Sequence, residues 1–127
     1  MRRIALLSTF LLGTIVNVTM AQSPNTVDVA TLQAELAKGG VQLVDVRTPQ
    51  EWNGGHIHGA LHIDWFSDDF KSRIGELDKE KPVRLYCAAG GRSEDARNML
   101  RDMGFKEVLD LDGGMSAWKK AGAPVEK

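Results

Sequence analysis

The chain of 127 residues has one cysteine, almost no net charge and no apolar run long enough to cross a membrane. A single cysteine excludes an internal disulfide and any C-x-x-C redox or zinc motif. The 16 Lys and Arg residues nearly balance the 17 Asp and Glu residues, whereas a nucleic-acid or anionic-membrane surface needs a clustered basic excess. The rest of the composition, 43% hydrophobic and 26% charged, is typical of one small globular domain.

The amino terminus is typical of a secretory signal peptide rather than of a folded element. A positive start, Met1–Arg3, precedes the thirteen uncharged residues Ile4–Val16, and small residues follow in Thr19–Ala21. Thirteen residues fall short of the ~20 that a membrane helix needs. There is no cysteine for lipid attachment, and nothing around the arginine pair favours twin-arginine export. We predict that residues 1–21 are removed and that residues 22–127 form a single periplasmic domain.

Apolar runs of strand length alternate with helical stretches along this domain. The expected strands are 27–29, 41–46, 60–63, 83–86 and 107–111, and the expected helices are 30–38, 49–54, 67–77, 93–103 and 114–121. A capping box with proline at the first helical position, Thr48–Glu51, begins the second helix. This alternation predicts βαβ units and a mainly parallel α/β sheet with helices on both faces. Ligand sites in such sheets lie beyond the carboxyl ends of the strands.

Cys87 stands where that rule places a site, directly after the expected strand 83–86. The following Ala88–Gly91 has little side-chain bulk, and glycine permits the positive φ angles that turn successive N–H groups inward as an anion-binding nest. Arg92 and the start of the helix 93–103 add positive potential. These groups should lower the pKa of Cys87 below its free value of ~8.5. The thiolate could then attack a sulfane sulfur and carry it as a persulfide, whereas the alternative is an inert buried thiol.

Three groups of residues resemble the motifs of the rhodanese-type sulfurtransferase family. The stretch Tyr86-Cys87-Ala88-Ala89-Gly90-Gly91-Arg92-Ser93 is similar to the active-site loop of the family. Asp45–Trp52 with Gly55–Ala60 is similar to its amino-terminal motif. Its carboxyl-terminal motif is similar to Gly104-Phe105, Leu111–Gly114, Trp118 and Gly122-x-Pro124. Together they span nearly all of residues 26–125. A secreted single-domain chain of this kind resembles the periplasmic phage-shock-protein-E type of the family.

The resemblance implies a rhodanese-like three-layer fold, with a five-stranded parallel sheet between helices. It implies that Cys87 is the catalytic, persulfide-forming residue and that the loop binds the persulfide and the substrate anion through backbone amides. The implied substrate-binding residues are Ala88, Ala89, Gly90, Gly91, Arg92 and Ser93. No cofactor or metal is implied, and the partners would be a small sulfur-containing anion such as thiosulfate and a thiol or cyanide acceptor. The alternative is a non-catalytic sulfur-carrier or docking module, although such members typically lose the cysteine.

Loop length separates this chain from the related phosphatases and arsenate reductases. The active-site loop of those proteins resembles the loop of this chain, but it is one residue longer: arginine follows the cysteine by six positions, and histidine usually precedes the cysteine. Here Arg92 is five positions after Cys87, and Tyr86 precedes it, so a phosphate should be too large for the loop. His62 stands where the family commonly has asparagine, and the loop has one charged side chain. The preferred donor therefore stays open.

Other polar residues have structural interpretations. His56 and His58 form an H-x-H pair, but a structural metal site normally has four ligands, so no metal site is predicted. Asp45, Arg47 and Glu51 are expected to form ion pairs and hydrogen bonds that join the first long strand to the short helix near the loop.

The aromatic residues and Arg92 complete the expectations. Trp52 and Trp118 are expected to pack in the core. Trp65, which Phe66 follows, is expected either to line the mouth of the site or to pack. Arg92 is the one charged side chain expected to attract the substrate anion, and the alternative is an outward-pointing arginine at a helix start.

Overall fold

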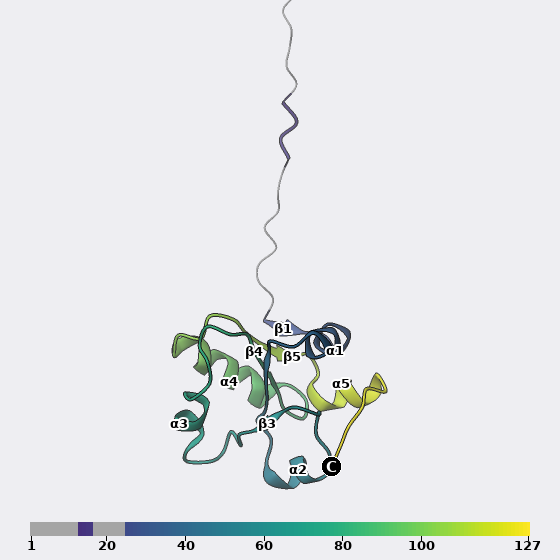
Figure 1. The fold of residues 1–127 in the computed structure, drawn as a ribbon, viewed down its shortest axis with the longest axis vertical. Helices are drawn as coiled ribbons and strands as arrows, with labels where there is room; N and C mark the ends of the chain where they lie inside the picture. Colours follow the sequence, from purple (N-terminus) through teal and green to yellow (C-terminus); the bar gives the residue numbers. More distant parts are fainter. Residues whose placement is uncertain (1–12, 17–24) are drawn as a thin grey trace, which may run out of the picture.

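The computed structural model describes residues 13–16 and 25–127 (Figure 1), so most of the predicted signal segment lies outside the described residues. The elements of the described part are β1 Thr26–Val27, α1 Val29–Lys38, β2 Gln42–Asp45, α2 Pro49–Asn53, β3 Leu61–His62, α3 Phe70–Ile74, β4 Val83–Tyr86, α4 Gly91–Asp102, β5 Val108–Leu111 and α5 Gly114–Lys120. No helix in this part has the length and apolarity to cross a bilayer.

The strands form one five-stranded sheet in the order β1-β5-β4-β2-β3, and all pairings are parallel. The central strand β4 is buried at every residue, because helices cover both faces of a parallel sheet. In Figure 1, α3 and α4 lie on one side of the sheet and α1 and α5 lie on the other. The predicted α/β class, with a parallel sheet between two helical layers, is confirmed.

Each face of the sheet has its own apolar core, because successive strand residues point to opposite faces. The core toward α3 and α4 contains Val44, Val46, Val83, Leu85, Phe70, Ile74, Ala96 and Leu100, together with Cys87. The core toward α1 and α5 contains Leu43, Tyr86, Leu111, Leu32, Met115 and Trp118. The two cores hold β4 from both sides and thereby fix where the chain leaves the sheet at Cys87.

Two helices confirm the local signals closely. At α2 the capping box is complete, since Thr48 Oγ1 accepts a hydrogen bond from Glu51 N and Glu51 Oε1 accepts one from Thr48 N, each at 3.3 Å. The predicted helix 93–103 is present as α4, but it begins two residues earlier, at Gly91. It can do so because Gly90, with φ of 124°, reverses the chain directly before it.

The prediction of a helix over 67–77 is wrong in extent, since α3 covers only Phe70–Ile74. Residues before it form turns: Ser67 Oγ donates to Asp64 O at 2.7 Å, and Ser67 N donates to the same carbonyl at 3.0 Å. Serine side chains that bond the nearby backbone compete with helix formation. Gly75 then caps the carboxyl end.

The predicted strand 27–29 is also displaced. β1 covers Thr26–Val27, and Asp28 is instead the N-cap of α1, where its Oδ1 accepts a hydrogen bond from Thr31 N at 2.7 Å. An aspartate cap satisfies a free N–H of the first helical turn. Val29 therefore begins the helix rather than continuing the strand.

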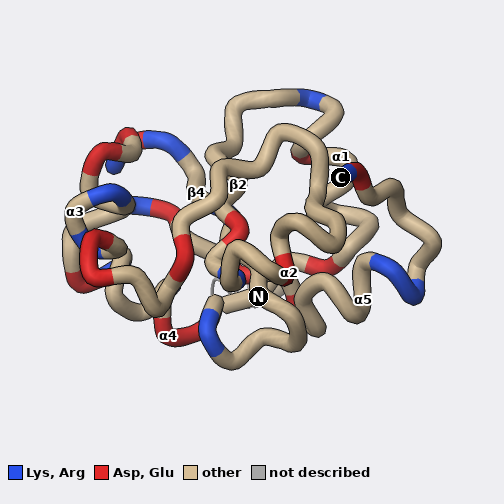
Figure 2. The backbone as a smooth tube through the Cα atoms, turned by 90° about the horizontal axis from the view of Figure 1, so that it is seen from below, with Lys and Arg blue, Asp and Glu red and all other residues tan. Residues whose placement is uncertain are grey.

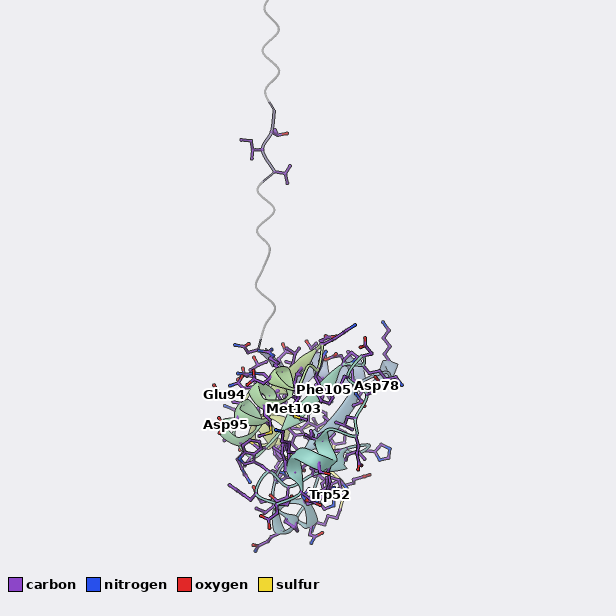
Figure 3. The ribbon with its side chains drawn as sticks, turned by 90° about the vertical axis from the view of Figure 1, so that its left-hand side faces the viewer. Trp52, Asp78, Glu94, Asp95, Met103 and Phe105 are labelled. Atoms are coloured by element: carbon purple, nitrogen blue, oxygen red, sulfur yellow. The ribbon has the colours of Figure 1, made fainter. Side chains whose placement is uncertain are left out.

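The tryptophans differ in their surroundings. Trp118 is 2% exposed in the core, as predicted. The prediction that Trp52 packs in the core is wrong, because its ring is half-buried and stacks on His56 with ring centroids 3.6 Å apart. Figure 3 shows Trp52 toward the opposite end of the molecule from Asp78. Trp65 packs on the core beside Phe70, with ring centroids 4.9 Å apart.

Candidate active site

The loop after β4 wraps its backbone around the sulfur of Cys87. Gly90 N donates a hydrogen bond to Cys87 Sγ at 3.0 Å, and Ser93 Oγ lies 3.5 Å from the same sulfur. The backbone φ of Gly90 is 124°, a value that residues other than glycine rarely adopt, so this turn requires glycine. Because α4 begins at Gly91, the sulfur also lies at the amino-terminal, positive end of a helix.

The six predicted loop residues all lie around this turn. Ala88 and Ala89 connect Cys87 to Gly90, and the stretch 91–93 forms the first turn of α4. Cys87 itself is 1% exposed. All six residues therefore lie next to Cys87 in the structure, and their roles toward a substrate stay predictions.

Opposing effects set the pKa of Cys87. Burial raises it, but hydrogen bonds from the Ser93 hydroxyl and from the backbone N–H groups of Ser93, Gly90 and Ala89 outweigh burial, so the pKa lies below its ordinary value. Each of these donors favours a charged sulfur over a neutral one. The direction agrees with the prediction, and the thiolate is the nucleophilic form of cysteine.

The first turn of α5 supports the loop from the other side. Met115 N donates to Cys87 O at 2.8 Å, and Ser116 donates to Ala88 O through both its N and its Oγ at 3.0 Å. Gly114 makes this approach possible: its φ is 55°, and a Cβ there would lie 2.5 Å from Cys87 O. Gly114 is thus explained by a close backbone contact with the loop, whereas a Cβ at the preceding N-cap, Gly113, would meet the side chain of Ala117.

Arg92 is not a free cation. Its Nη1 lies 2.7 Å from Glu51 Oε1, and its Nη2 lies 3.0 Å from Oε2. The hydrogen bonds from Arg92 hold the pKa of Glu51 down at about 2. On its other side the guanidinium lies 5.9 Å from the ring centre of Phe66, which is 67% exposed. Attraction of an anion by Arg92 stays a prediction, and part of that charge is neutralised by Glu51.

A buried ion pair fixes α2 beside the loop. Arg47 Nε and Nη2 bind the carboxylate of Asp45 at 2.7 to 3.1 Å, and Nη2 also donates to Gly55 O at 2.7 Å. The pair joins the end of β2 to the residue beyond α2, as the sequence predicted. Tyr86 adds a second link, because its hydroxyl accepts a hydrogen bond from Ile57 N at 3.0 Å.

A polar network behind the cysteine was missed by the sequence reasoning. Ser93 Oγ donates to Asp110 Oδ2 at 3.2 Å, and Arg97 Nη1 donates to Asp110 Oδ1 at 2.5 Å. All three residues are buried. The available signal was weak: Arg97 follows Ala96 on the apolar side of its helix, and Asp110 interrupts an apolar strand. Only the pairing of α4 with β5 brings the three together.

Two pockets flank the loop. One, of about 420 Å³, is lined by Ala89, Gly90 and Gly91 with Glu94, Arg97, Asp110 and Asp112. The other, of about 310 Å³, lies beside Ala88 and is lined by Arg47, Glu51, Ser116 and Lys119. Figure 3 shows Glu94 on the outer side of α4. Acidic groups thus outnumber basic ones on the first side, and Lys119 adds a cation on the second.

The H-x-H pair fastens the carboxyl-terminal tail. His58 Nδ1 lies 2.9 Å from Glu126 Oε2, His56 Nε2 lies 3.5 Å from Oε1, and His56 N donates to Glu126 O at 2.8 Å. Within residues 13–16 and 25–127 no cluster of three or more His, Cys, Asp or Glu side chains could hold a metal ion. His62 Nε2 contacts Arg47 O at 2.7 Å, outside the loop.

The fold and the loop define a parallel α/β domain that presents a cysteine at the carboxyl edge of its sheet. The chain belongs to the rhodanese-like domain family, whose model matches residues 28–121. It is 39% identical over 83 residues to the thiosulfate sulfurtransferase GlpE of Shewanella oneidensis, which covers 65% of this chain and 80% of the relative. It is 32% identical over 100 residues to GlpE of Vibrio cholerae, covering 79% of this chain and 92% of the relative.

A solved structure shows the same fold. The rhodanese-like domain of an Anabaena protein matches with a TM-score of 0.73 and 32% identity, over 82% of this chain and 80% of that chain. The predicted family and the predicted fold are confirmed.

Proposed function

We propose that this protein is a sulfurtransferase that moves a sulfane sulfur from a donor such as thiosulfate to cyanide or a thiol through a persulfide on Cys87. The observation that carries the proposal is the hydrogen bond of 3.0 Å from Gly90 N to Cys87 Sγ, in a loop that also holds the Ser93 hydroxyl near the sulfur. Hydrogen-bond donors arranged in this way around Cys87 Sγ stabilise the negatively charged thiolate. The names of the two GlpE relatives support this reaction class.

The proposed reaction has two halves. In the first, the Cys87 thiolate attacks the outer sulfur of thiosulfate, a sulfur–sulfur bond forms at Sγ, and sulfite leaves with the electron pair of the broken bond. In the second, cyanide or a thiolate attacks the outer sulfur of the persulfide, and the electron pair returns to Sγ. The loop amides and the Ser93 hydroxyl stabilise the anionic sulfur before and after each half. Cys87 is the only cysteine, so an external acceptor must complete the cycle.

Intact mass and thiocyanate release test this proposal. Protein purified after expression of the full chain is reduced and incubated with thiosulfate. Its intact mass is measured by mass spectrometry, and cyanide is then added. We expect a gain of one sulfur atom, its loss on cyanide addition, and catalytic thiocyanate release. Cys87→Ser should abolish the gain while the circular dichroism spectrum stays that of the parent. Glu94→Gln, an exposed change near the loop, is the matched control and should load sulfur normally.

Three other outcomes would overturn the proposal. Sulfur gain without turnover, with both cyanide and thiol acceptors, would identify a sulfur carrier instead of an enzyme. No gain in the folded, reduced protein would favour a docking module. Transfer that persists in Cys87→Ser would contradict the persulfide mechanism.

We also propose that residues 1–21 are a secretory signal and that the protein acts as a single periplasmic domain. The positive start and the short apolar stretch before small residues support this. Its proposed partners are small sulfur compounds, with no nucleic acid and no membrane. Figure 2 shows acidic and basic residues mixed around α3 rather than gathered by sign. Protein recovered from the periplasm of a Gram-negative host should begin at Gln22, whereas an unprocessed chain in the cytoplasm would contradict export.

A further inference from the structure

Three buried polar side chains form a chain of contacts behind Cys87. The Ser93 hydroxyl lies 3.5 Å from Cys87 Sγ and 3.2 Å from Asp110 Oδ2, and Arg97 binds the other oxygen of Asp110. Ser93, Asp110 and Arg97 are 0%, 2% and 6% exposed. Each buried charge therefore depends on its partner rather than on water.

Stability alone does not account for this pair. Arg97 Nε has no hydrogen-bond partner among the described residues, although it is buried. A buried donor without a partner is unfavourable, and apolar side chains of similar volume can replace a buried ion pair without loss of stability. The contact of Asp110 with Ser93 gives the pair a second consequence, because Ser93 is also in contact with the sulfur.

Ser93 has one hydroxyl proton, and its neighbours compete for it. Gly90 O lies 3.2 Å away, in addition to Asp110 and Cys87. A thiol at Cys87 can donate its own proton to Ser93 Oγ, which leaves the hydroxyl proton for Asp110 or Gly90. A thiolate has no proton to give and attracts the hydroxyl proton to itself. The direction of this hydroxyl is therefore coupled to the charge on the sulfur.

We propose that Asp110 and Arg97 are positioning residues that set the direction of the Ser93 hydroxyl and, through it, the balance between the neutral and charged sulfur of Cys87. The Asp110 carboxylate draws the hydroxyl away from the sulfur, and Arg97 limits that pull by neutralising the carboxylate. Burial raises the pKa of Asp110, and the contact with Arg97 opposes the rise.

The other charged groups around the loop have different partners. Arg92 is paired with Glu51 from α2. Glu94 is exposed on α4 and approaches Arg97 only to 3.9 Å. Asp112, beyond β5, is exposed. Asp110 is therefore the carboxylate that the described residues place in contact with Ser93.

The balance between the thiol and the thiolate of Cys87 affects both halves of the proposed sulfur transfer. The kinetic part of the inference rests on that proposed function. A thiolate of lower pKa is a weaker nucleophile toward the donor and a better leaving group when an acceptor attacks the persulfide. A change at Asp110 should therefore move the two half-reactions in opposite directions. A general loss of structure would slow both.

The test is a pH titration of the ultraviolet absorbance of the Cys87 thiolate. Asp110→Asn keeps the shape of the side chain and removes the charge, and we expect the pKa of Cys87 to fall by about one unit. Arg97→Met combined with Asp110→Leu removes both charges in a form expected to fold, and it should give a smaller fall. In a Ser93→Ala background, Asp110→Asn should change the pKa of Cys87 by less than half as much as it does in the parent protein.

Glu35→Gln is the matched control. It also changes the carboxylate partner of a buried arginine, since Arg84 Nη2 lies 2.7 Å from Glu35 Oε2, but that pair lies away from the loop. It should lower stability without moving the pKa of Cys87. An unchanged pKa in folded Asp110→Asn and in the double variant would overturn the proposal. An equal shift with and without Ser93 would also overturn it, because Asp110 would then act directly on the sulfur.

Kinetics give a second readout, measured above the pKa of every variant. For Asp110→Asn, kcat/KM for thiosulfate should fall about threefold, and kcat/KM for the acceptor should rise about threefold. Parallel changes in both constants would contradict the positioning role. If no variant transfers sulfur at all, the proposed function fails, whereas the thiolate titration still decides the inference.

Discussion

The ion pair between Glu51 and Arg92 predicts linked effects on stability and on donor binding. Glu51→Gln keeps an oxygen that can accept the hydrogen bond from Thr48 N, and it removes the charge that Arg92 binds at 2.7 and 3.0 Å. The pKa of Glu51 is lowered from 4.5 to about 2, and a shift of that size corresponds to at most about 3 kcal/mol. The two side chains are 31% and 22% exposed, so solvent screening reduces the expected contribution to about 1 kcal/mol.

The pH dependence has a definite sign. Because the pKa of Glu51 is lower in the folded protein than in the unfolded chain, the stabilisation is fully present above pH 4.5 and decreases as the pH falls toward 2. At pH 7 the free energy of unfolding of the variant should be lower by about 1 kcal/mol, which corresponds to a decrease in Tm of about 4–8 °C. This difference should shrink steadily below pH 4.5. Thermal and urea unfolding followed by circular dichroism measure it, with Glu94→Gln as the exposed control.

The same substitution leaves Arg92 without its carboxylate partner beside the loop. We expect the KM for thiosulfate to fall about threefold, with a larger effect at low ionic strength because salt screens exposed charges. Equal stability at pH 7, or a stability loss that is the same at pH 7 and pH 2.5, would refute the charge argument. A stability loss with an unchanged KM would show that Arg92 does not attract the donor.

Three further substitutions test how the loop is supported. Gly114→Ala should lower stability by at least about 2 kcal/mol and slow sulfur loading, because its φ of 55° and the contact with Cys87 O both exclude a Cβ. Gly39→Ala is the control, because Gly39 also has a positive φ, of 82°, but has open space around it and caps α1 away from the loop; equal loading rates in the two variants would contradict this reasoning. Leu100→Ala, at a fully buried core position, should cost about 2–5 kcal/mol in urea unfolding with an unchanged slope, and a loss below 1 kcal/mol would be inconsistent with this packing. Thr48→Ala removes the cap of α2 and should cost about 1 kcal/mol, as measured by the urea midpoint, whereas an unchanged midpoint would mean that the cap contributes nothing.

The sequence determined the features that depend on neighbours along the chain. The capping box of α2 joins residues three positions apart, and the turn at Gly90 needs only a glycine between a strand and a helix. Strand and helix periods also specified the α/β class, because side chains alternate with period 2 in strands and about 3.6 in helices. The position of Cys87 at the carboxyl edge of the sheet follows from these local features alone. Boundaries that depended on competing turns, as at Ser67, were placed wrongly.

Tertiary structure decided which charges meet. Arg92 pairs with Glu51, 41 residues away, and Arg97 with Asp110, 13 residues away. The first pair requires that β4 lies beside β2, and the second that it lies beside β5. That strand order reflects the packing of two apolar cores against both faces of the sheet, which no local window of sequence contains. The charge around the sulfur is therefore a property of the fold, whereas the cysteine and its glycine turn are properties of the chain.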